Sequence, residues 1–170
     1  MAIREIVTVP HSVLRGQARN VKKNGKDLQV LIDDMIETMR LAPGVGLAAP
    51  QVNVSLRVIV VEYGEEDEEG NTVIPTRLYS VINPEISRRS DQLEIGIEGC
   101  LSIPGFVGDV KRSEAVTVKG YNRHGQPMRI KANGWLARIF QHEIDHINGV
   151  LYTDIAERVW QLEEETPQVL

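Results

Sequence analysis

The chain has 170 residues, a length that fits one compact domain because it can bury a sizeable apolar core. Its 24 acidic residues outnumber its 19 basic residues and give a formal net charge of −5, so we expect no direct binding of nucleic acid. The first residues lack the apolar core of a signal peptide, and no apolar run is long enough to span a membrane. We therefore expect a cytoplasmic protein that makes no membrane contact.

The first half of the chain predicts one helix and one buried strand. Over residues 26–41, apolar side chains recur at the three- and four-residue spacings of an amphipathic helix: Leu28, Leu31, Ile32, Met35, Ile36 and Met39. Pro43 and Gly44 end this helix, and a loop of small residues follows over 45–51. Residues 56–61 are rich in β-branched side chains and predict a strand, whereas the acidic stretch 62–71 is typical of a solvated hairpin loop.

The second half predicts several strands and one helix within a single domain spanning 1–170. The strand-like segments are 78–82, 93–97, 115–121 and 126–131, mostly antiparallel neighbours, with a turn at 122–125. Asn133 is a suitable N-cap for a helix over 134–147, which Gly149 is placed to end. Residues after about 156 are mostly acidic and polar, so we expect at most a short turn there and a loosely ordered tail from about 163.

Two histidines lie four residues apart on the second predicted helix. This spacing places His142 and His146 on one face, close enough to share a metal ion. Trp135 and Ile139 precede His142 by seven and three residues, so the histidine face continues as an apolar stripe. Glu143 projects beside the histidines, where it can accept a proton from water whose pKa a metal ion has lowered. A solvent-facing polar turn is the competing interpretation.

The third ligand decides the class of metal site, because a catalytic ion usually has three protein ligands and an open position. A metzincin protease would carry a further histidine where this chain has Tyr152. A thermolysin-like protease would need a downstream glutamate, which only the short C-terminal region could supply. Cys100 is the better third ligand, since thiolate is a strong donor for zinc or ferrous iron.

Three motifs together resemble the peptide deformylase family. They are Gly-Val-Gly-Leu-Ala-Ala-Pro-Gln at 44–51, Glu-Gly-Cys-Leu-Ser at 98–102 and Gln-His-Glu-Ile-Asp-His at 141–146, in the family's order and with similar separations. The resemblance extends over most of residues 1–155 and implies an α+β fold, with antiparallel strands wrapped around a central metal-bearing helix and an additional N-terminal helix. It also implies removal of the formyl group from the N-terminal formyl-methionine of newly made polypeptides, with release of formate.

The resemblance assigns a chemical role to each motif. The metal ligands that it implies are Cys100, His142 and His146. Glu143 would act as general base and acid, while Gln51 and the backbone N–H of Leu101 would donate hydrogen bonds to the formyl oxygen. Glu98 would pair with Arg112 and so fix the loop that carries the cysteine ligand.

Substrate binding is assigned to residues around these motifs. Backbone contacts to an extended peptide, added as a strand, would come from Val45, Gly46 and Gly99. Trp135 and Ile139 are candidates for the pocket that takes the methionine side chain, and Arg138 is placed near its rim. Core packing is the competing interpretation of both apolar residues.

The resemblance also implies a cofactor and partners. Fe2+ would be the physiological ion, although a Cys-His-His set also binds Zn2+ or other divalent ions. The partners would be formyl-methionyl nascent peptides, in transient proximity to the ribosome.

Two other functions stay open. A zinc protease or another metal amidase would cleave peptide bonds without any need for Cys100. A non-enzymatic metal-binding redox module would use the thiolate, and Glu143 would be incidental.

Overall fold

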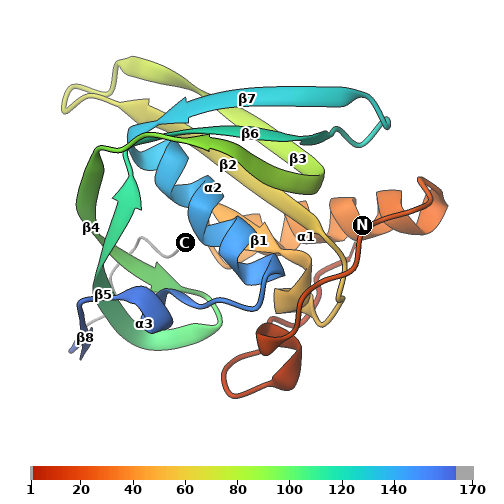
Figure 1. Cartoon of the computed structure of the whole chain (residues 1–170), viewed down its shortest axis with the longest axis horizontal. Coiled ribbons are helices and arrows are strands. Elements are labelled where there is room, and N and C mark those ends of the chain that lie inside the picture. Colours follow the sequence, from red (N-terminus) through yellow and green to blue (C-terminus); the bar gives the residue numbers. More distant parts are fainter. Residues whose placement is uncertain (1, 164–170) are drawn as a thin grey trace.

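The computed structural model describes residues 2–163, which form two antiparallel β-sheets around a helix (Figure 1). The first sheet has the strand order β1-β2-β3-β6-β7 and comprises β1 (Gly46–Ala48), β2 (Val58–Glu66), β3 (Thr72–Arg89), β6 (Ala115–Tyr121) and β7 (Pro127–Asn133). The second has the order β4-β5-β8 and comprises β4 (Leu93–Cys100), β5 (Ile103–Ser113) and β8 (Arg158–Gln161).

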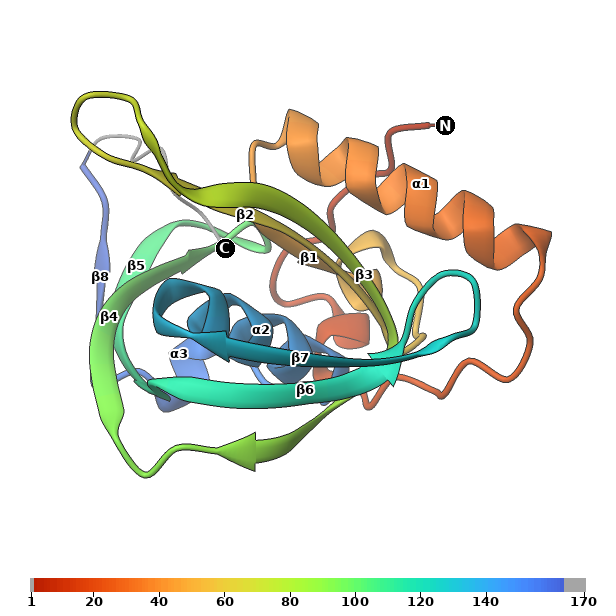
Figure 2. The ribbon, with the colours of Figure 1, turned by 90° about the horizontal axis from the view of Figure 1, so that it is seen from above.

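Two long helices pack on opposite faces of the first sheet. The apolar stripe of α1 (Lys26–Leu41) packs against β1 and β2 on the outer face. The inner face packs against α2 (Gly134–Ile147), which shares a core with side chains from β2, β3, β6 and β7. Figure 2 shows α2 enclosed by the strands while α1 lies outside them. The expected α+β architecture, with strands wrapped around a central helix and an N-terminal helix, is confirmed.

The backbone around Gly149 fixes the C-terminal end of α2. The helix begins after Asn133 as predicted, although the Asn133 side chain makes no capping hydrogen bond. At the other end the N–H of Gly149 donates to the carbonyl oxygen of His146 at 3.1 Å, and its φ of 76° is a conformation that favours glycine. A Cβ at Gly149 would lie 2.5 Å from the carbonyl oxygen of Arg15. The histidine-bearing end of α2 therefore packs closely on the N-terminal region.

The first half of the acidic stretch 62–71 is strand, so the prediction of a loop over all of it was wrong. Strand β2 continues to Glu66 and pairs with β3, with Glu65 opposite Ile74. The turn is confined to the residues after the strand, where the Asp67 carboxylate accepts the N–H groups of Glu69 and Asn71. Cross-strand pairing outweighs the weak local strand preference of acidic residues.

Four other regions are more ordered than the sequence predicts. Residues 45–51 contain β1 and the start of a 3₁₀ helix (Ala49–Val52), and a short helix α3 (Tyr152–Ile155) follows α2. Strand β5 was not predicted because Pro104, Gly105 and Gly108 weaken its local signal. Beyond residue 156 the chain forms β8, not a short turn, and pairs with β5. The tail predicted from about 163 lies almost entirely outside the described residues.

None of the described helices has both the length and the apolar character needed to cross a membrane.

Candidate metal and catalytic site

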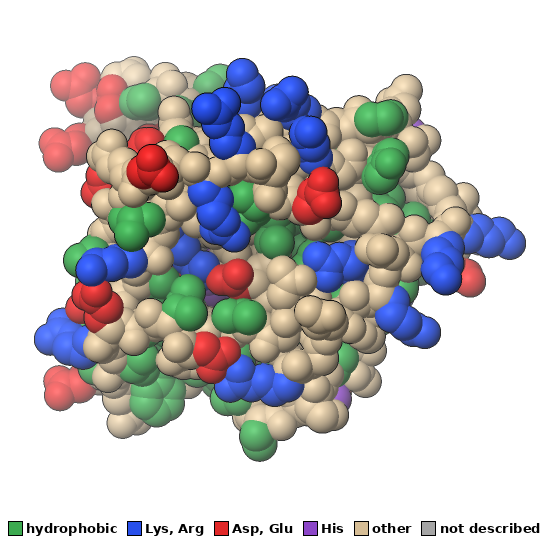
Figure 3. Space-filling model, viewed as in Figure 1, with side chains coloured by type: hydrophobic (Ala, Val, Ile, Leu, Met, Phe, Trp, Pro, Cys, Tyr) green, Lys and Arg blue, Asp and Glu red, His purple; other side chains and the backbone are tan. Residues whose placement is uncertain are grey.

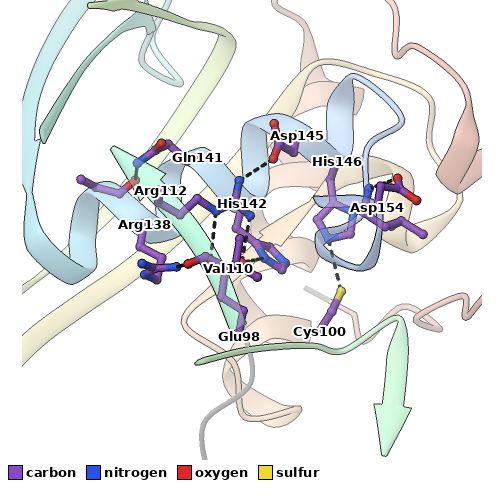
Figure 4. A network of polar contacts seen from close by, with 12 residues as sticks. Glu98, Cys100, Val110, Arg112, Arg138, Gln141, His142, Asp145, His146 and Asp154 are labelled. Carbon is purple, nitrogen blue, oxygen red and sulfur yellow. Dashed lines mark hydrogen bonds and ion pairs between the residues drawn. The ribbon is translucent and has the colours of Figure 1, made fainter. Parts of the chain in front are cut away.

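Helix α2 and the end of strand β4 bring three metal-binding side chains together. His142 and His146 lie one helical turn apart, with ring centroids separated by 4.9 Å. Cys100 reaches the site from the second sheet, and its Sγ lies 3.3 Å from His146 Nε2 (Figure 4). The ligand atoms of the three residues all lie within 4.8 Å of one another, and all three side chains are buried. Figure 3 shows only a small histidine surface near the middle of the face, recessed among charged and hydrophobic side chains.

The donor atoms fit a divalent ion. His142 Nδ1 lies 2.8 Å from a Glu98 oxygen, and its buried Nε2 has no hydrogen-bond partner among the described residues. A buried ring nitrogen without a partner is unusual in a folded protein and is explained by a metal bond. Burial holds the pKa of His146 well below its ordinary value, so that imidazole is neutral and able to bind metal. One thiolate and two imidazoles suit zinc or ferrous iron.

Glu143 is a fully buried carboxylic acid beside the metal ligands. Its exposed fraction is 0%, and neither carboxylate oxygen has a hydrogen-bond partner among residues 2–163. Burial raises its pKa to about 7, which lets the group accept and return a proton near neutral pH. The side chain lies directly over Gly46 of β1, where a Cβ would collide with the carboxylate. Gly46 is therefore placed to make room for the proposed base.

Glu98 holds the site together from β4. Its two oxygens accept hydrogen bonds from Arg112 at 2.8 and 2.9 Å and from Arg138 at 2.6 Å (Figure 4). Burial opposes ionisation of Glu98, but the hydrogen bonds from Arg112 and His142 outweigh it and hold the pKa well below the ordinary range. The ionised carboxylate accepts the Nδ1–H of His142 and so directs Nε2 toward the metal position. The predicted pairing of Glu98 with Arg112 is present and buried.

Gln51 is held in one orientation beside Cys100. Its Oε1 accepts the Ala48 N–H at 3.0 Å, and its Nε2 donates to Ser102 Oγ at 3.2 Å and contacts Cys100 Sγ at 3.7 Å. The exposed fraction of Gln51 is 0%. Leu101 follows the cysteine in the tight turn between β4 and β5. The structure thus places both expected hydrogen-bond donors next to the same ligand.

The residues expected to contact peptide backbone lie on two edge strands or directly beside one. Gly46 belongs to β1, at the edge of the first sheet, and Gly99 belongs to β4, at the edge of the second. Val45 precedes β1, and its carbonyl oxygen accepts the N–H of Glu62. An edge strand offers free backbone groups with which an extended peptide can pair.

The predictions for the side-chain pocket need one correction, which concerns Ile139. Arg138 borders the cavity beside Trp135, although its exposed fraction is only 4% and its guanidinium donates to Glu98 and to the carbonyl oxygens of Val110 and Glu94. Ile139 is fully buried in the core that α2 shares with the first sheet, so core packing explains it.

Trp135, in contrast, lines a cavity. The cavity has a volume of about 190 Å³ and is lined by Gly96, Ser113, Trp135, Arg138 and neighbouring residues. The Trp135 ring also lies beside the Arg138 guanidinium, 5.6 Å from its carbon. Of Trp135 and Ile139, the two apolar candidates for the pocket, only Trp135 borders this cavity.

Sequence reasoning missed four contributors to the site. Gly96 is needed because a Cβ there would lie 2.7 Å from the Arg138 guanidinium carbon. Asp145 accepts a hydrogen bond from Arg112, and Ser102 accepts one from Gln51. The Gln141 side chain accepts the N–H of Ser113 and donates to the carbonyl oxygen of Ser113. One signal was available: Arg138 precedes His142 by four residues, so it is a charged residue on the buried helix face and needs a partner there.

Comparisons with known proteins agree with this geometry. The family model described as polypeptide deformylase matches residues 3–161. A peptide deformylase of Symbiobacterium thermophilum is 54% identical over 91% of this chain and 67% of its own length. One of Dehalococcoides mccartyi is 48% identical over 98% of this chain and 94% of its own length.

A solved structure shows the same fold. The class I type b peptide deformylase from Acinetobacter baumannii with Met-Ala-Ser bound matches with a TM-score of 0.82 and 35% identity, covering 91% of this chain and 98% of that one. The family model accounts for nearly all of the described residues, including every residue of the metal and catalytic cluster. The chain belongs to the polypeptide deformylase family.

Proposed function

We propose that the chain hydrolyses the formyl group from the N-terminal formyl-methionine of newly synthesised polypeptides and releases formate. The observation that carries this proposal concerns His142 Nε2 and the Glu143 carboxylate, which lie beside Cys100 and His146 and have no hydrogen-bond partner among the described residues. Family membership supports the same activity. The tripeptide Met-Ala-Ser bound by the Acinetobacter baumannii enzyme begins with an unformylated methionine, as the product of this reaction would.

Cys100, His142 and His146 would hold the ion. A divalent ion there supplies a Lewis acid that polarises a carbonyl group and lowers the pKa of water. We propose Fe2+ as the physiological ion, with Zn2+ or another divalent ion as an alternative occupant, because a thiolate and two imidazoles accept both.

Glu143 would move the proton. It accepts a proton from the attacking water as the water oxygen bonds to the formyl carbon. It then gives that proton to the nitrogen as the carbon–nitrogen bond breaks, which yields formate and a free amino terminus. Its raised pKa suits both steps because the protonated and ionised forms lie close in free energy near neutral pH.

Gln51 and Leu101 would stabilise the charge that develops on the formyl oxygen. The Nε2 of Gln51 is aimed toward Cys100, and the backbone N–H of Leu101 belongs to the next residue along the chain. Fixed donors of this kind act mainly on the transition state, where the oxygen carries more negative charge than in the substrate.

The peptide would bind as an extended strand at the edges of β1 and β4, using the backbone of Val45, Gly46 and Gly99. The methionine side chain would enter the cavity beside Trp135, where a thioether gains from contact with an aromatic ring. We also propose that the enzyme works in the cytoplasm and transiently near the ribosome, because formylated amino termini arise there.

The test is formate release from formyl-Met-Ala-Ser by anaerobically purified protein, together with metal analysis of the wild type and of Glu143→Ala. We expect rapid release by the wild type and almost none by the variant, with equal metal content. A fully metallated, inactive wild type would refute the proposal. Retained activity in Glu143→Ala would refute the proposed role of Glu143, and peptide-bond cleavage by a metallated Cys100→Ala variant would favour a protease.

A further inference from the structure

The two proposed donors to the formyl oxygen lie on segments of different sheets. Gln51 belongs to the 3₁₀ helix that follows β1, and Leu101 to the turn that joins β4 to β5. In the part of the chain that the structure describes, β1 and β4 belong to separate sheets and no strand pairing joins them. The relative position of the donors therefore depends on contacts made across this boundary.

The N-terminal segment bridges the boundary. The N–H of Val7 donates to the carbonyl oxygen of Gln51 at 2.8 Å, and the N–H of Val9 donates to the carbonyl oxygen of Ser102 at 2.9 Å. Ser102 follows Leu101 in the turn, and its hydroxyl accepts the hydrogen bond from the Gln51 side chain. Val7, Val9, Ser102 and Gln51 therefore form a closed ring of contacts that contains one donor and adjoins the other in sequence.

The same segment is anchored upstream on α1. The N–H of Ala2 and the guanidinium of Arg4 both donate to the Asp34 carboxylate, at 2.8 and 2.9 Å. The N–H of Arg4 donates to the Thr38 hydroxyl at 2.9 Å. Val7 and Val9, which reach the site, are thus tied through Ala2 and Arg4 to helix α1. Their position is therefore set by the packing of α1 on the rest of the fold.

We infer that the N-terminal segment, residues 2–9, is a positioning element for the oxyanion donors, acting through the backbone N–H groups of Val7 and Val9. The inference rests on the proposed roles of Gln51 and Leu101. A displacement of about 1 Å in a catalytic group can cost on the order of 100-fold in rate. Loss of one backbone contact to Gln51 should therefore affect the transition state more than substrate binding.

The test is Val7→Pro, which removes the N–H that donates to Gln51. We expect kcat per bound metal ion to fall roughly 10- to 100-fold while KM changes less than about threefold. Val7→Ala keeps the N–H and should stay within about twofold of the wild type. Glu5→Pro places a proline in the same segment at a position whose N–H donates to no residue within 2–163, and it should behave like the wild type. Val9→Pro, which removes the other N–H, should show the same loss of kcat and serves if Val7→Pro does not fold.

A double-mutant cycle with Gln51→Ala separates the inference from the proposed function. If positioning of Gln51 is the cause, Val7→Pro should lower kcat little further in the Gln51→Ala background. Equal losses of kcat in both backgrounds, or a lowered melting temperature with unchanged kcat per metal ion, would overturn the inference. An unchanged kcat in Gln51→Ala alone would instead refute the proposed role of Gln51.

Discussion

Gly46 lies directly against the carboxylate of Glu143, and the space that a side chain at position 46 would need is already occupied by that carboxylate. Strand β1 and helix α2 pack together at this point, so neither can retreat without disturbing the core. Glycine at position 46 is therefore explained by the space that the proposed base occupies, as well as by the close approach of a peptide backbone.

Gly46→Ala should displace the Glu143 carboxylate and lower kcat by roughly 10- to 100-fold, because the proton-transfer distance changes. Metal content should stay close to that of the wild type, since Glu143 is not a ligand in the proposed site. Steady-state kinetics with formyl-Met-Ala-Ser and metal analysis measure both quantities. Gly16→Ala is a matched control, because a Cβ at Gly16 meets no atom within 4 Å. A fully active Gly46→Ala enzyme would contradict this assignment.

Gln51→Ala should lower kcat by roughly 100- to 1000-fold, the usual cost of losing one donor to a developing oxyanion. KM should change much less, because the donor acts mainly in the transition state. Rates of formate release at saturating and subsaturating substrate concentrations separate the effect on kcat from the effect on KM. A rise in KM with unchanged kcat would show that Gln51 serves binding alone.

Arg138→Met should destabilise the protein by about 2–4 kcal/mol, because it leaves the buried Glu98 carboxylate without one of its charged donors. Urea unfolding of the metal-free protein measures the free energy of unfolding without a contribution from the ion. The matched control is Arg158→Met, since Arg158 is exposed and contacts Asp109 at 3.4 Å, and it should change stability little. Equal stability of the two variants would refute a structural role for Arg138 on Glu98.

Asp34→Asn should loosen the N-terminal segment, and its effect should depend on pH. Burial raises the pKa of Asp34, but hydrogen bonds from the Ala2 N–H and from Arg4 outweigh it and hold the pKa below the ordinary value. A carboxylate with a depressed folded pKa contributes stability that is complete above its unfolded pKa of about 3.9 and is lost as the pH falls through the folded pKa.

The difference in free energy of unfolding between wild type and Asp34→Asn should therefore be constant from about pH 5 to pH 8 and shrink below about pH 4. Urea titrations of the metal-free protein across that range measure it. Hydrogen exchange of residues 2–6 should be faster in the variant at neutral pH. If the difference in free energy of unfolding instead grew as the pH fell, the pKa of Asp34 could not be lowered in the folded protein.

The sequence by itself determined the two long helices and the chemistry of the site. The periodicity of residues 26–41 and the caps around 134–147 are local signals, and the structure has helices at Lys26–Leu41 and Gly134–Ile147. The spacing of His142 and His146 fixes their common face through helix geometry alone, and the position of Cys100 as third ligand followed from its chemistry and the family resemblance.

Only the tertiary structure decided which distant residues support that chemistry. Strand β8 exists because β5 supplies its hydrogen bonds, and β2 extends through acidic residues because β3 pairs with it. Arg138 lies against Glu98 because Gly96 leaves room for its guanidinium. Apart from the β2–β3 hairpin, these contacts join residues far apart in the chain. Local residue preference does not specify a pairing whose stability comes from packing and hydrogen bonding between distant segments.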